Sequence, residues 1–97
     1  MKSLKSIKQQ LKKQMPILKK EYNISQLGIF GSFIKNKSNS KSDLDLLVNF
    51  SKTPTLFEFI NLENYLARLL NIKVDLVSQK ALKPHIGEKV LKEVEYI

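Results

Sequence analysis

A glycine-serine pair, followed at a fixed distance by two aspartates, is the feature that most limits what this chain can fold into. Residues 24–30 form a mostly apolar segment that leads into Gly31 and Ser32, and Asp43 and Asp45 begin a second apolar segment ten residues later. Side chains alternate between faces along a strand, so the two aspartates point the same way, with Cα atoms roughly 6.5–7 Å apart. The alternation predicts a half-buried strand whose polar face is anionic at its start.

Two carboxylates this close repel each other, and a bound cation would offset the repulsion. Their repulsion in a partly desolvated site is on the order of several kcal/mol without a cation. Hard oxygen ligands of this kind favour Mg²⁺ or Mn²⁺. The alternative interpretation is an acidic pair on a solvated strand edge, which is a common surface arrangement.

A third aspartate, Asp75, lies in a segment that predicts another strand. Residues 72–78 alternate, with Ile72, Val74 and Leu76 on one face and Asp75 on the other. If the two strands are neighbours in suitable register, Asp75 joins the first two aspartates. Three carboxylates suit two divalent ions about 3.5–4 Å apart, the arrangement that serves phosphoryl and nucleotidyl transfer.

The Gly-Ser pair and the polar loop after it are the candidate nucleotide-binding segment. Gly31 allows a close backbone approach to an anion, and Ser32 adds a hydroxyl donor. Lys35 and Ser42, near the two ends of the polar loop 34–42, are further candidates for phosphate contact. We expect this loop to act as a mobile flap. A plain strand-to-loop turn is the alternative for the Gly-Ser pair alone.

The order Gly31-Ser32, ten residues, Asp43-Leu44-Asp45, and then Asp75 thirty residues later resembles the minimal nucleotidyltransferases of the DNA polymerase beta-like superfamily. The resemblance covers nearly the whole chain. The pattern is most similar to the nucleotidyltransferase-type (MNT) antitoxins that pair with HEPN-domain toxins.

The resemblance implies a fold, a reaction and a role for each residue. The Gly31-Ser32 turn would hold ATP, Asp43 and Asp45 would bind two Mg²⁺ ions, and Asp75 would ligate the catalytic ion and help to prepare the acceptor hydroxyl. In the antitoxin group, AMP is transferred from ATP to a tyrosine of the partner toxin. A HEPN-domain toxin is thus the implied partner.

The chain departs from the family at two positions after the Gly-Ser pair. Lys35 stands where Arg is usual, and Asn36 where Gly is usual. Lysine still neutralises phosphate, although without the bidentate fork of arginine. Asparagine tolerates the left-handed backbone conformation better than most residues. The change therefore bears on turnover and triphosphate affinity more than on fold.

Size and composition agree with one small enzyme domain. We expect residues 1–97 to form one α+β domain, a short mixed β-sheet with helices packed against it. The absence of cysteine excludes disulfides, thiolate zinc sites and cysteine nucleophiles. No apolar run approaches the roughly 18 residues of a membrane span, and no hydrophobic block follows the first lysines, so a cytoplasmic protein is expected.

Three helices are expected around these strands. Leu4, Ile7, Leu11 and Leu18 mark an amphipathic leading helix that Pro16 should kink or split. A second helix over about residues 56–70 should begin at Pro54 or at a Thr55–Glu58 capping box. The last helix should open at Pro84, and its expected core-facing residues are Ile86, Val90, Val94 and Ile97.

Charge gathers in the leading helix. Residues 1–20 hold seven lysines and no acid, which supplies +7 of the net +8. One interpretation is a basic surface for nucleic acid. The favoured one is a solvated lysine face, because phosphate and base recognition usually involve arginine and aromatic residues, and the chain has one arginine.

Two alternatives to the enzyme remain at this point: an antitoxin that neutralises its toxin by stoichiometric binding without catalysis, and a nucleic-acid-binding module that uses the leading helix. His85, the one histidine, is expected to be an exposed residue of the last helix's first turn rather than a general base.

Overall fold

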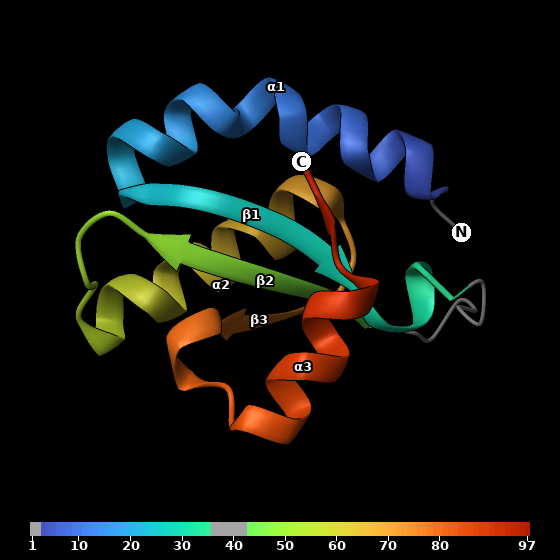
Figure 1. The fold of residues 1–97 in the computed structure, drawn as a ribbon. Coiled ribbons are helices and arrows are strands. Elements are labelled where there is room, and N and C mark those ends of the chain that lie inside the picture. Colours follow the sequence, from blue (N-terminus) through green and yellow to red (C-terminus); the bar gives the residue numbers. More distant parts are fainter. Residues whose placement is uncertain (1–2, 36–42) are drawn as a thin grey trace.

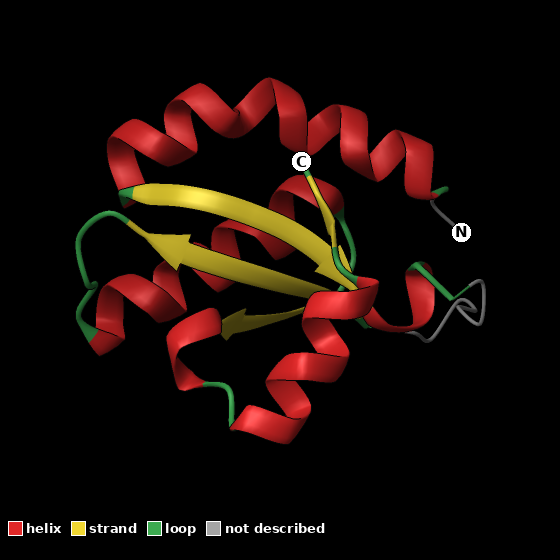
Figure 2. Cartoon of the chain, in the orientation of Figure 1, coloured by secondary structure: helices red, strands yellow, loops and turns green. Residues whose placement is uncertain are grey.

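The computed structural model describes residues 3–35 and 43–97. The helices and strands are α1 (Leu4–Tyr22), β1 (Ile24–Phe30), β2 (Leu44–Phe50), α2 (Leu56–Leu70), β3 (Val74–Ser78), α3 (Pro84–Glu93) and β4 (Glu95–Tyr96), with short 3-10 turns at Gly31–Phe33 and Gln79–Ala81. The described strands form a four-stranded sheet in the order β3-β2-β1-β4. Figures 1 and 2 show helices on both faces of this sheet.

The sheet is mixed, as the sequence predicts. β1 runs antiparallel to β2 and to β4, whereas β2 runs parallel to β3. The parallel pair is joined through α2, the crossover connection that parallel strands require. The predicted α+β architecture is confirmed.

α1 and α2 cover one face of the sheet and form the main core. Figure 1 shows α1 along the top and α2 behind the strands. The apolar stripes of both helices are fully buried against alternate residues of the strands. The members of this core cluster with an exposed fraction of 2% or less are Ile7, Leu11, Leu18, Ile24, Leu27, Ile29, Leu44, Leu46, Val48, Leu62, Leu66 and Leu70.

Pro16 does not split the leading helix. α1 is one helix from Leu4 to Tyr22 with Pro16 inside it. An interior proline removes one backbone hydrogen bond and costs about 3 kcal/mol. Ile7 and Leu11 before it and Leu18 after it are all buried on the same side, so packing offsets that cost. Of the two predicted alternatives, a kink or a split at Pro16, the split is therefore wrong.

α2 begins at a capping box. The Thr55 side chain accepts a hydrogen bond from the Glu58 amide, and the Glu58 carboxylate accepts one from the Thr55 amide. At the other end, Asn71 adopts the left-handed conformation that terminates the helix. The predicted capping box and the predicted helix over about residues 56–70 are both confirmed. β3 starts at Val74, slightly after the predicted Ile72.

α3 and the segment after it lie against the opposite face of the sheet. Gly28 of β1 faces that side, and a Cβ atom there would lie 2.6 Å from Val94 and 3.0 Å from Tyr96. The amide of Ile97 donates to the carbonyl of Leu27 at 2.9 Å. A residue without a side chain at position 28 thus lets the C-terminal segment cross close over the sheet.

The end of the chain differs from the prediction. The last helix starts at Pro84 as expected, but it stops at Glu93, and Glu95–Tyr96 form β4 on the edge of β1. Ile86, predicted to face the core, is 56% exposed. Backbone pairing with β1 satisfies the amides and carbonyls that a longer helix would have paired internally.

Candidate active site

The Gly-Ser turn joins the end of β1 to the region of the aspartates. Gly31 has a φ of 80°, a left-handed conformation that favours glycine. Its carbonyl accepts from the amides of Ile34 and Lys35, both at 3.1 Å, which closes the 3-10 turn. A Cβ atom at Gly31 would lie 2.1 Å from Oδ2 of Asp45. Glycine is therefore required for the turn to lie directly against this carboxylate.

Asp45 and Asp75 are register partners on adjacent strands. β2 and β3 run parallel with Asp45 opposite Asp75, so both side chains stand on the same face of the sheet. Asp43 lies two residues before Asp45, immediately ahead of β2, and shares that face. This is the side of Gly28 and α3, away from the main core. The predicted placement of the three aspartates on one face agrees with the geometry.

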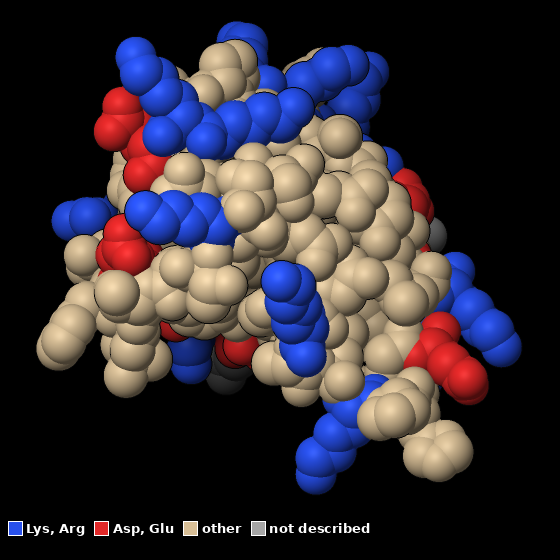
Figure 3. Space-filling view, turned by 60° about the vertical axis from the view of Figure 1, so that its left-hand side comes forward, with Lys and Arg blue, Asp and Glu red and all other residues tan. Residues whose placement is uncertain are grey.

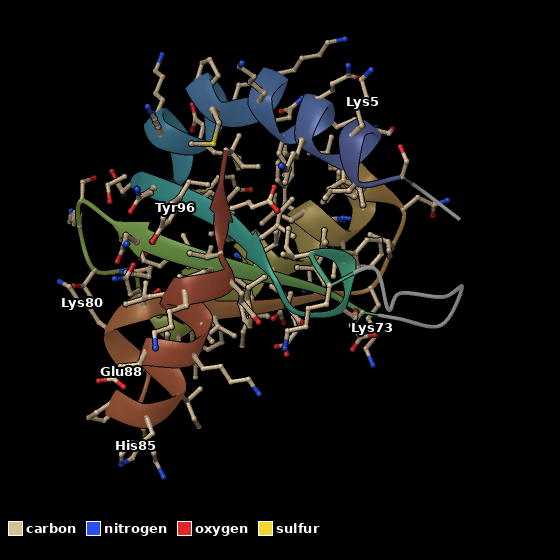
Figure 4. All side chains as sticks on the ribbon, turned by 45° about the vertical axis from the view of Figure 1, so that its right-hand side comes forward. Lys5, Lys73, Lys80, His85, Glu88 and Tyr96 are labelled. Carbon is tan, nitrogen blue, oxygen red and sulfur yellow. The ribbon has the colours of Figure 1, made fainter. Side chains whose placement is uncertain are left out.

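The electrostatics of the cluster indicate excess negative charge. The pKa of Asp45 is raised to about 6, chiefly by burial and then by the neighbouring carboxylates of Asp75, Asp43 and Glu93 in that order. A nearby cation would stabilise the charged form of a carboxylate whose pKa is raised in this way. Lys73 offers little, since its ammonium is 3.9 Å from Asp43 and its side chain is 82% exposed (Figure 4).

The chemical type of the candidate ligands, carboxylate oxygens, suits a hard divalent cation. These ligands lie on one sheet face, with a raised pKa at the centre of the set. Within residues 3–35 and 43–97, however, no three acidic or histidine side chains stand close enough together to coordinate one ion. The backbone thus brings the three aspartates to one face, and shared coordination would need side-chain rotation.

Glu93, at the end of α3, is the site residue that the sequence analysis missed. Its carboxylate accepts from the Gly31 amide at 3.1 Å and pairs with the Lys35 ammonium at 3.0 Å. Lys35 and the Gly31 amide both lower the pKa of this carboxyl, with Lys35 the larger cause, while partial burial opposes them. One signal was available: a helix from Pro84 places Glu93 near the apolar stripe of Ile86 and Val90, where a charge is unexpected.

The remaining nucleotide-binding candidates fall into two groups. Lys35 lies at the turn but is already paired with Glu93, and its side chain is 39% exposed. Ser32 follows Gly31 in the 3-10 turn and is partly exposed. Ser42, Asn36 and most of the predicted flap lie outside the described residues. Of these candidates, the structure places Gly31 directly against Asp45, and Ser32 and Lys35 follow in the same turn.

The histidine and two of the tyrosines lie in scaffold positions. His85 is exposed in the first turn of α3, at the tip of the helix in Figure 4, which confirms the prediction. The rings of Tyr22 and Tyr65 lie 5.5 Å apart between α1 and α2, and the Tyr65 hydroxyl donates to Gln14 at 2.8 Å. None of these groups lies at the aspartates.

A mixed sheet that sets a Gly-Ser turn against aspartates on two neighbouring parallel strands is the arrangement of a nucleotidyltransferase. The profile of the family described as "Polymerase beta, Nucleotidyltransferase" matches residues 9–97. The chain belongs to this family of nucleotidyltransferases, among its minimal MNT-type members.

Two archaeal relatives are similar over most of their length. A Methanocaldococcus jannaschii protein, provisionally named a protein adenylyltransferase, is 43% identical over the whole of both chains. The protein adenylyltransferase MntA of Thermococcus cleftensis is 41% identical over 82% of this chain and 81% of its own.

Solved structures share the fold. One described as a minimal nucleotidyltransferase has a TM-score of 0.83 and 30% identity, covering 97% of this chain and 95% of its own. An MNT antitoxin in complex with a tri-AMPylated HEPN toxin of Shewanella oneidensis has a TM-score of 0.63 and 21% identity, covering 90% of this chain and 70% of that one. The second likeness concerns the fold alone.

Proposed function

We propose that this chain is a Mg²⁺-dependent protein adenylyltransferase that acts as the antitoxin of a HEPN-domain toxin. In this reaction the hydroxyl oxygen of a toxin tyrosine attacks the α-phosphorus of ATP. A new oxygen–phosphorus bond forms, the bond from the α-phosphorus to the bridging oxygen breaks, and pyrophosphate leaves. The hydroxyl proton passes to a carboxylate of the site.

The register of Asp45 with Asp75, beside the Gly31 turn, is the observation that carries the proposal. We assign nucleotide binding to Gly31, Ser32 and Lys35, and metal binding to Asp43, Asp45 and Asp75. When bound, Mg²⁺ would neutralise charge on the transferring phosphoryl group. Asp75 is exposed, so an acceptor hydroxyl can reach it from solvent, and we assign it the preparation of that hydroxyl.

The small size of the enzyme supports a protein acceptor. Every described helix and strand belongs to the scaffold that carries the site, so acceptor recognition falls to the surface of a docked partner. The names of the archaeal relatives point to a protein as acceptor, and the Shewanella complex supplies the HEPN toxin as the kind of partner. ATP as the AMP donor and a HEPN toxin as the acceptor both fit a reaction in the cytoplasm.

The test is transfer of label to the partner. The chain is incubated with Mg²⁺, α-³²P-ATP and the HEPN-type protein encoded beside its gene, and the partner should become labelled. Asp43→Ala and Asp45→Ala should abolish the label. Glu88→Ala, an exposed carboxylate on the outer side of α3 (Figure 4), is the matched control and should retain it.

The outcomes separate transfer from simple binding. ATP labelled at the γ-phosphate should leave the partner unlabelled, because that phosphate departs with pyrophosphate. Replacing the acceptor tyrosine by phenylalanine should also remove the label. An Asp43→Ala, Asp45→Ala double variant that still protects cells from the toxin would instead favour neutralisation by stoichiometric binding.

A further inference from the structure

We propose that Glu93 is a positioning residue for nucleotide binding, holding Lys35 and the Gly-Ser turn in the geometry that receives the triphosphate. The inference rests on the proposed function, and it adds a residue from α3 to a site otherwise built from β1, β2 and β3. Glu93 acts through Lys35 and Gly31 rather than on the reacting atoms.

The two carboxylate oxygens of Glu93 have separate partners. Oε1 accepts from the Gly31 amide at 3.1 Å, and Oε2 pairs with the Lys35 ammonium at 3.0 Å. One side chain therefore spans the turn from Gly31 to Lys35, whose amide makes one of the turn's closing hydrogen bonds. Charge-assisted contacts of this kind are stronger than neutral hydrogen bonds.

The Glu93 carboxylate contacts the turn, whereas a backbone hydrogen bond closes the end of its own helix. The C-terminus of α3 is closed by the backbone, where the amide of Val94 donates to the carbonyl of Val90 at 2.9 Å. The Glu93 side chain leaves the helix to reach a turn 62 residues earlier in the sequence. Its side chain is 17% exposed, so water screens the pair with Lys35 less than a fully exposed one.

A lysine at position 35 benefits from a partner such as Glu93 that restricts its side chain. Its ammonium is a point charge on a flexible stem, and fixing that stem costs about 2 kcal/mol of rotamer entropy. The ion pair with Glu93 meets part of this cost before a nucleotide arrives. The pair also keeps the cation at the turn, although the Asp45 carboxylate lies against Gly31 and would attract it.

The experiment compares Glu93→Gln with Lys35→Gln and with the double variant. Glutamine keeps an acceptor for the Gly31 amide and removes the charge that holds Lys35. Binding of the non-hydrolysable analogue AMP-PNP with Mg²⁺ is measured by calorimetry, and KM for ATP and kcat by transfer to the toxin. Glu95→Gln is the matched control, because Glu95 lies two residues away and pairs with Lys8 away from the turn.

We expect Glu93→Gln to weaken AMP-PNP binding and raise KM for ATP roughly three- to ten-fold, with kcat within about two-fold. The double variant should be no worse than Lys35→Gln alone, because both changes remove the same contact. Glu95→Gln should match the unaltered chain. A lowered melting temperature with unchanged nucleotide affinity would reduce Glu93 to a structural role and overturn the inference.

Tighter AMP-PNP binding by Glu93→Gln would also overturn it, since Glu93 would then compete with the triphosphate for the turn. Additive losses in the double variant would show that Glu93 does not act through Lys35 and would have the same consequence. If the unaltered chain bound no AMP-PNP, the proposed function and this inference would fail together. Normal binding by the unaltered chain and by Glu93→Gln alike would overturn the inference alone.

Discussion

Asp45 on β2 and Asp75 on β3 face each other across the parallel pair of strands, and Gly31 lies directly against the first of them. The chain thereby concentrates negative charge on one sheet face and sets a glycine turn beside it. Both features have consequences that can be measured without the partner protein.

Stability should depend on pH through Asp45. Its pKa is about 6 in the folded chain, against 3.8 for an aspartate in an unfolded chain, so the folded state binds the proton more tightly. This contribution is fully present below pH 3.8 and is lost as pH rises through 6. At about 1.4 kcal/mol per pKa unit the loss is on the order of 3 kcal/mol before solvent screening, which reduces it.

Urea denaturation of the metal-free chain between pH 4 and pH 7 measures this loss. Asp45→Asn should flatten the decline, whereas the exposed Glu88→Gln should keep it. Mg²⁺ should stabilise the unaltered chain more at pH 7.5 than at pH 5, because protons compete with the ion. An unchanged pH slope in Asp45→Asn would contradict the prediction.

Gly31→Ala should disable the site by displacing Asp45. The new Cβ would lie 2.1 Å from Oδ2 of Asp45, and alanine disfavours a φ of 80°. We expect a loss of about 1–3 kcal/mol in the free energy of unfolding and loss of Mg²⁺-dependent AMP-PNP binding. Differential scanning calorimetry and titration calorimetry measure the two effects.

Gly87→Ala is the control for this substitution. Gly87 lies within α3, where an added Cβ would meet Leu82 at an ordinary 3.6 Å. Because alanine favours a helix more than glycine does, this variant should be equally or slightly more stable, by up to about 1 kcal/mol. If both alanine variants bound AMP-PNP equally well, the contact between Gly31 and Asp45 would have no role in the site.

Thr55→Ala should lower stability without altering nucleotide binding. It removes the side-chain acceptor at the start of α2, a change that costs about 1 kcal/mol. Thr53→Ala, two residues earlier and exposed, should have little effect. Thermal unfolding measures the difference, and an equal loss in both variants would argue against the cap.

The lysines of α1 should be dispensable for AMP transfer. Blue side chains gather along the top of the molecule in Figure 3, over α1. Lys5→Gln combined with Lys12→Gln should leave the transfer rate within about two-fold, since both lysines lie on α1, outside the strands and turn of the site. Duplex binding with a steep salt dependence, lost in this double variant, would instead favour the nucleic-acid alternative.

The sequence predicts the strands and α2 well, because each carries its own local signal. Alternation placed Asp43 and Asp45 on one face of a strand, and Thr55 with Glu58 marked the start of α2. The neighbouring positions of β2 and β3 could only be assumed from sequence. Their register, which aligns Asp45 with Asp75, is set by packing over the whole sheet.

Long-range contacts account for what the sequence did not reveal. Glu93 reaches a turn 62 residues away, and no local pattern encodes such a pair. β4 forms because β1 offers a free edge, which overrides the helical periodicity of the last residues. Pro16 stays within α1 for the same kind of reason, since packing outweighs a local preference.

The geometry of the site depends on Gly28, a residue that has no side chain. The approach of Val94 to its Cα fixes how near the end of α3 comes to the sheet, and that distance decides whether Glu93 can span to Lys35. A valine at position 28 would wedge the C-terminal segment outward and draw the carboxylate away from the turn. A larger residue at position 28 of β1 would therefore weaken the affinity for ATP, although every polar group of the site is unchanged.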